Sequence, residues 1–145
     1  MDLDSIRESA TARLDETYRA REVGLRNCRQ IIRASANAIR SLHRGEGDAS
    51  AELIAEAGGL LSETMEVLSD HPDILHAGFV HDAAKEYAEA ILTTALAEGS
   101  SLPSPEEIGV AVPAYLNGLG EAVGELRRRM LDLLRAGDLD AAEAT

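Results

Sequence analysis

The chain has 145 residues, 45% of them apolar, and a net charge of −12. This length suits one domain with a buried core, and we expect a single domain over residues 1–145. One cysteine excludes an internal disulfide, and no apolar run approaches the ~20 residues that span a bilayer. The polar start, MDLDSIRES, is unlike a signal peptide. These features predict a cytoplasmic protein with no membrane partner.

Ala, Leu, Glu and Arg, all of them good helix formers, dominate the sequence. Residues 3–42 contain no proline, and their apolar residues recur every three or four positions, which predicts one long helix ending before Gly45. A second helix is expected over residues 49–68. A third is expected from Pro72 to residue 97, closing at Gly99.

The last third begins with a helix-start signal. Ser104 precedes a proline and stands three residues before Glu107, which predicts a capping box and a short turn. A fourth helix is expected over residues 113–136, and Asp138 is suited to cap a fifth. Three glycines inside the fourth helix predict close approach by another helix: Gly118, Gly120 and Gly124. No strand pattern is present, so we predict an all-α antiparallel bundle.

One face of the first helix carries a line of arginines, which we call the arginine stripe. Its members are spaced by three, four or seven residues, opposite the apolar face: Arg26, Arg29, Arg33, Arg40 and Arg44. Such a line suits phosphates, because a guanidinium bonds two oxygens at once, and His43 would add to it. The alternative is a solvated face balanced by acids of neighbouring helices. Spacing alone favours that alternative.

Two pairs of glutamates lie one turn apart, Glu86/Glu89 and Glu121/Glu125, away from the expected apolar ridges. Clustered carboxylates suit Mg²⁺, which takes oxygen ligands. With two metals, such a cluster could activate a water and stabilise the leaving oxygen of a phosphodiester. The alternative is an ordinary acidic surface, which spacing alone favours in a chain with 26 acids.

Several segments, in this order and spacing, resemble the translin family, which comprises translin and translin-associated factor X. The resemblance covers about residues 15–142. The segments include REVGLRNCRQIIR (21–33), AIRSLHRG (38–45), KEYAEA (85–90), LPSPEEIGV (102–110), YLNGL (115–119) and GELRR (124–128). The Glu-Tyr-x-Glu-Ala and Gly-Glu-Leu-Arg-Arg patterns are the most specific of them.

The resemblance implies an all-α fold assembled into a hollow homo-oligomer with a basic interior. It also implies that acidic residues facing this interior bind Mg²⁺ and cleave single-stranded RNA in the factor-X-like members, whereas translin itself lacks them. Glu86 and Glu89 stand at the glutamates of Glu-Tyr-x-Glu, and Glu125 at that of Gly-Glu-Leu. Glu121 stands where catalytic members generally have aspartate. It keeps the charge but reaches one methylene further.

A second departure from the family is at the C-terminus. Family members usually continue with another long helix, whereas this sequence ends at Thr145. We therefore expect a domain with a shortened C-terminal helix and apolar surface left bare around Leu131 and Leu134. The expected fold is unaffected by this difference.

The favoured interpretation is a translin-type endoribonuclease acting on single-stranded RNA and dependent on Mg²⁺ or Mn²⁺. Its predicted catalytic and metal residues are Glu86, Glu89, Glu121 and Glu125. Its predicted nucleic-acid-binding residues are Arg26, Arg29, Arg33, Arg40, His43 and Arg44. One alternative is a non-catalytic oligomer that binds single-stranded RNA or DNA. The other is a helical Mg²⁺-dependent nucleotide pyrophosphohydrolase, which fits the first glutamate pair but leaves the arginine stripe unexplained.

Overall fold

The computed structural model describes residues 2–145, and this part of the chain is helical with no strand. The all-α prediction is confirmed. In chain order the helices are α1 (Leu3–His43), α2 (Gly47–Val67), α3 (Pro72–Leu75), α4 (Gly78–Glu98), α5 (Pro105–Ile108), α6 (Val112–Ala136) and α7 (Leu139–Ala144). Within residues 2–145, no helix combines the length and apolar character needed to cross a membrane.

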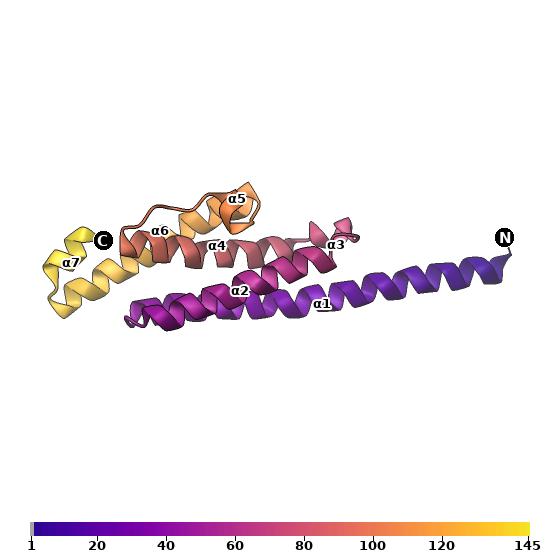
Figure 1. Ribbon diagram of the computed structural model, residues 1–145, viewed down its shortest axis with the longest axis horizontal. Helices are drawn as coiled ribbons and strands as arrows, with labels where there is room; N and C mark the ends of the chain where they lie inside the picture. The colour runs from indigo at the N-terminus through magenta and orange to yellow at the C-terminus, as the bar shows by residue number, and fades with distance from the viewer. Residues whose placement is uncertain (1) are drawn as a thin grey trace.

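Helix α1 is the longest helix of the bundle. Its N-terminal half projects beyond the other helices, while its C-terminal half lies alongside α2 and α4 (Figure 1). Burial begins only at Ala20, and Leu14 and Tyr18 on the projecting part are exposed. The helix ends as the sequence predicts, because Gly45 adopts a positive φ of 79° that a glycine reaches without strain.

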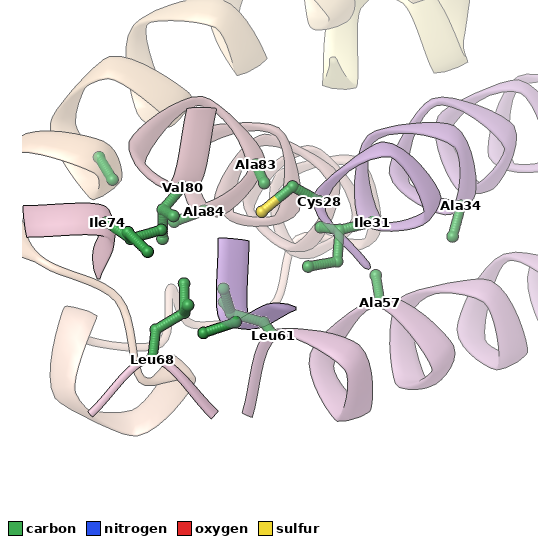
Figure 2. Close-up of a cluster of buried hydrophobic side chains, with 12 residues drawn as sticks. Cys28, Ile31, Ala34, Ala57, Leu61, Leu68, Ile74, Val80, Ala83 and Ala84 are labelled. Carbon is green, nitrogen blue, oxygen red and sulfur yellow. The ribbon is translucent and has the colours of Figure 1, made fainter. Parts of the chain in front are cut away.

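The main core lies where α1, α2 and α4 meet (Figure 2). Cys28 and Ile31 of α1 pack in one buried cluster with Leu61 of α2 and Val80 of α4. Alanines fill much of the remaining contact surface, which lets the helix axes approach closely. Cys28 is 2% exposed and therefore a core residue.

A second core joins α4 to α6. Here Ala88 and Leu92 of α4 pack against Tyr115 and Ala122 of α6. Gly118 lies at the closest point, where an added Cβ would stand 2.8 Å from two backbone atoms of α4. The predicted close approach is therefore confirmed at Gly118. The same prediction is wrong within this chain for two further glycines, which face open space: Gly120 and Gly124.

The expected third helix is not continuous. Ala77 is extended, with φ −73° and ψ 151°, and separates the short α3 from α4. The break allows Ile74, before it, and Val80, after it, to enter the same core cluster. The end of α4 at Gly99 agrees with the prediction, because Gly99 has a φ of 67°.

The remaining helix ends follow the sequence signals. Ser104 and Glu107 form the predicted capping box, each side chain accepting a hydrogen bond from the other's backbone N–H. Asp138 caps α7 by accepting from Ala141 N–H at 3.1 Å. Leu131 and Leu134 are 39% and 44% exposed, in agreement with the expected bare apolar surface.

Candidate metal and nucleic-acid site

Three of the predicted glutamates meet between α4 and α6. Glu86 and Glu89 of α4 and Glu121 of α6 each offer a carboxylate oxygen, and these oxygens lie within 4.8 Å of one another. We call this group the carboxylate cluster. The expectation that the pairs face away from the core is wrong for Glu89, which is only 8% exposed. Its side chain is enclosed because Gly118 lets α6 lie directly against this part of α4.

Lys85 bridges the carboxylate cluster. Its Nζ donates to both oxygens of Glu121, at 2.8 and 2.9 Å, and lies 3.0 Å from an oxygen of Glu86. The hydrogen bonds to Glu121 are the main reason that the pKa of Lys85 rises above its usual range, and the contact with Glu86 adds to it. Lys85 is therefore held in its charged form.

Glu89 is the member of the carboxylate cluster whose pKa is shifted. Burial, together with the negative charges of Glu86, Glu121 and Glu125, raises the pKa of Glu89 to about 7. The neighbouring carboxylates contribute to this rise, so Lys85 does not offset all of their negative charge. A further cation would relieve that excess.

Glu125 lies apart from this group and pairs with His43. The two side chains approach to 2.6 Å between His43 Nε2 and a Glu125 oxygen, and they are 11% and 24% exposed. The contact ties the last turn of α1 to α6. Glu125 is therefore not one of the three carboxylates that converge, although its negative charge contributes to the raised pKa of Glu89.

The pairing of α4 with α6 continues one turn before Lys85. The Nδ2 of Asn117 lies 3.3 Å from His81 Nε2. Reasoning from the sequence gave no role to Lys85 or Asn117. The only available signal for Lys85 was that it is the one lysine beside thirteen arginines, one residue before Glu86.

The arginine stripe lies on α1 opposite the core, as predicted, and all five of its members are exposed. Arg44 forms an ion pair with Glu46 at 2.6 Å, and Arg40 donates to Asn37 at 2.7 Å. Within residues 2–145, no carboxylate lies within ion-pair distance of the three others: Arg26, Arg29 and Arg33. Acids of neighbouring helices therefore do not balance the stripe by direct contact, except at Arg44.

His43 links the helix of the arginine stripe to α6. It follows Arg40 by three residues on α1, and it reaches Glu125, which stands one turn after Glu121 on α6. The helix that carries the basic residues is thus linked, through His43, to the helix that carries Glu121 and Glu125.

The carboxylate cluster has the chemistry of a site for a hard divalent cation. Three oxygen donors converge, and burial together with the neighbouring negative charges raises the pKa of Glu89. Glu86, Glu89 and Glu121 are the residues that would hold such an ion. The predicted fourth ligand, Glu125, is held by His43 instead.

No protein-family model matches the sequence. An uncharacterized protein of Methanocaldococcus jannaschii is 26% identical over 125 residues, which make up 85% of this chain and 55% of that protein. The chain thus spans about half the length of this curated relative.

Solved structures give a closer match. The structures of AfC3PO and of its complex with duplex RNA are 32% identical to this chain and match it with a TM-score of 0.85, over 94% of this chain and 70% of theirs. The crystal structure of apo-NeC3PO matches over 98% of this chain and 73% of its own, with a TM-score of 0.77. At 23% identity, the match to apo-NeC3PO supports the fold alone.

Proposed function

This chain belongs to the translin family, and from this premise we propose that it is an RNA-binding protein with Mg²⁺-dependent endoribonuclease activity. The observation that carries the proposal is the convergence of three carboxylate oxygens within 4.8 Å, on helices that a His43–Glu125 hydrogen bond links to the helix of the arginine stripe. The related AfC3PO has been solved with duplex RNA, which supports RNA as the ligand.

The arginine stripe is the proposed backbone-binding element. Arg26, Arg29 and Arg33 are exposed and have no carboxylate in direct contact within residues 2–145, so their guanidinium groups are available to phosphates. Binding through phosphates is insensitive to base identity and weakens steeply with salt. The net charge of −12 makes this local concentration of positive charge necessary for RNA to approach.

The carboxylate cluster is the proposed catalytic element. Glu86, Glu89 and Glu121 would hold Mg²⁺ or Mn²⁺ by their oxygens. When bound, the ion supplies activation of water and neutralisation of charge at the phosphodiester. His43 and Glu125 share a hydrogen bond beside the cluster and can hold a proton between Nε2 and the carboxylate. Both residues are largely screened from solvent, which favours that role.

A non-catalytic RNA- or DNA-binding protein is the second candidate, and one observation favours it. Lys85 already offsets part of the charge of the carboxylate cluster. A protein that needs no metal could keep this arrangement permanently. The nucleotide pyrophosphohydrolase gains no comparable support, because it assigns no role to the arginine stripe.

A cleavage assay separates the two candidates. End-labelled single-stranded RNA is incubated with the protein in Mg²⁺ and in EDTA, beside Glu86→Gln and the matched control Glu98→Gln, an exposed glutamate at the end of the same helix. We expect cleavage in Mg²⁺ by the parent and by Glu98→Gln only. RNA that stays intact but bound, with or without Mg²⁺, selects the non-catalytic protein.

The form of the RNA and the assembly state are further parts of the proposal. We propose single-stranded RNA as the substrate and a homo-oligomer as the active form. The same assay with a duplex of equal length tests the first, since AfC3PO has been solved with duplex RNA. The particle mass in solution tests the second. Preferential cleavage of the duplex, or a monomeric mass for the active protein, would contradict the respective part.

A further inference from the structure

Lys85 occupies the carboxylate cluster as a metal ion would. Its three N–H donors face three carboxylate oxygens, two from Glu121 and one from Glu86, at 2.8 to 3.0 Å. The side chain is only 19% exposed. The Glu121 side chain is 46% exposed. The ammonium joins two helices and contacts three oxygens, which distinguishes this ion pair from a single surface contact.

The same oxygens are the ones that a divalent cation needs. Glu121 has two carboxylate oxygens, and both accept hydrogen bonds from Lys85. A cation bound to Glu121 must therefore take an oxygen that the ammonium already uses. It would also lie a few ångströms from the positive charge of Lys85, which repels it. Lys85 and the cation cannot both occupy the cluster without cost.

We propose that Lys85 is an internal counter-cation, which holds the carboxylate cluster together in the metal-free protein and is displaced from Glu121 when a divalent cation binds. This inference rests on the proposed function, because it takes the same three carboxylates as metal ligands. Lys85 thereby sets the metal concentration at which the site fills. Its flexible four-carbon stem allows the ammonium to move toward solvent without a change in the helices.

A direct test is a titration of the full chain with Mn²⁺. Electron paramagnetic resonance measures binding as a loss of the signal of free Mn²⁺. Lys85→Gln should bind Mn²⁺ about tenfold more tightly than the parent, because the competing charge is gone. Lys85→Arg keeps the charge and should gain no affinity. Arg127→Gln changes the net charge equally at an exposed position of α6 and is the matched control.

Two outcomes of this titration would overturn the inference. One is an unchanged affinity in Lys85→Gln. The other is an equal gain in Lys85→Gln and Arg127→Gln, which would reflect the total charge of the protein only. Absence of Mn²⁺ binding in every variant would refute both this inference and the proposed metal site.

Thermal melting gives a second readout that needs no activity. In EDTA, Lys85→Gln should melt below the parent, because the carboxylates of Glu86, Glu89 and Glu121 then repel one another without an intervening cation. Saturating Mn²⁺ should raise its melting temperature more than that of the parent, since tighter binding to the folded state stabilises it more. Equal melting temperatures of the two proteins in EDTA would contradict the inference that Lys85 holds the carboxylate cluster together in the metal-free protein.

The two proposals fail in different ways. If Lys85→Gln binds Mn²⁺ more tightly but neither it nor the parent cleaves RNA, the counter-cation role stands and the endoribonuclease proposal falls. If the parent cleaves RNA and Glu86→Gln does not, but Lys85→Gln binds Mn²⁺ with the affinity of the parent, the endoribonuclease proposal stands and the counter-cation role falls.

Discussion

His43 Nε2 lies 2.6 Å from a carboxylate oxygen of Glu125, and this contact links α1 to α6 across the bundle. Elsewhere α1 packs mainly against α2 and α4. The pair therefore joins the helix of the arginine stripe to the helix that carries Glu121. It also uses the one predicted ligand that does not converge with the other three.

A double-mutant cycle on this pair should give a measurable coupling. We expect His43→Ala and Glu125→Ala each to lower the free energy of urea unfolding, and the double variant to lower it by less than their sum. The coupling should be about 1–3 kcal/mol, as for a sheltered hydrogen bond to a charged group. The exposed ion pair of Arg7 and Asp4 is the control and should couple by well under about 1 kcal/mol. Strict additivity at His43 and Glu125 would show that the contact does not contribute.

The arginine stripe makes a prediction about salt. Replacing Arg29 and Arg33 together by alanine should weaken binding to single-stranded RNA. It should also lower the slope of log affinity against log salt by about 1.4, since each phosphate contact contributes about 0.7 for single strands. Fluorescence anisotropy in EDTA at several salt concentrations measures both effects without cleavage. Arg7→Ala, on the projecting part of α1, is the control. A weaker affinity with an unchanged slope would mean that these arginines do not contact phosphates.

The raised pKa of Glu89 predicts how the free energy of unfolding of the metal-free protein depends on pH. Its folded-state pKa of about 7 lies above the ordinary 4.5, so the folded state binds this proton more tightly than the unfolded chain. The contribution of Glu89 to stability is therefore fully present below pH 4.5 and is lost as the pH rises through 7. Glu89→Gln cannot ionise and avoids this loss. In EDTA at pH 8 it should be more stable than the parent by up to about 3 kcal/mol, and the gain should largely vanish at pH 5.

Urea unfolding at both pH values measures this difference directly. Glu98→Gln, which changes an exposed glutamate of the same helix, should show no such dependence. A stability difference for Glu89→Gln that stays constant between pH 5 and pH 8 would contradict the assignment.

Local signals in the sequence predicted most helix ends but not the break between α3 and α4. The left-handed glycines Gly45 and Gly99 and the capping box at Ser104 depend on neighbouring residues only, so they can be read from the chain. The extended Ala77 cannot, because it follows from the need to bury residues on both sides of it in one core. No proline or glycine cluster marks the position.

Three of the four predicted carboxylates converge, but their electrostatics was not predicted. Spacing identified the two glutamate pairs and placed them on outward faces, and the family patterns then gave them a role. The burial of Glu89 and the bridge from Lys85 to Glu121 both depend on a contact between α4 and α6, whose partners lie 36 residues apart in the second case. Periodicity describes one helix at a time, so it carries no information about such a contact.

Gly118 allows that contact, and its replacement should therefore disturb both the fold and the site. A Cβ at residue 118 would lie 2.8 Å from Glu89 N and from Lys85 O, which are backbone atoms and cannot turn aside. Gly118→Ala should cost about 1–3 kcal/mol in urea unfolding despite the better helix propensity of alanine. It should also weaken Mn²⁺ binding, because separating α6 from α4 moves Glu121 away from Glu86 and Glu89.

Gly120 provides the matched control for this prediction. It lies in the same helix, and an added Cβ there would meet nothing within 4 Å. Gly120→Ala should therefore leave Mn²⁺ binding unchanged and stabilise the protein by up to about 1 kcal/mol, the helix-propensity difference alone. If Gly118→Ala and Gly120→Ala have the same effect on unfolding and on Mn²⁺ binding, the close approach of α6 to α4 is not what assembles the carboxylate cluster.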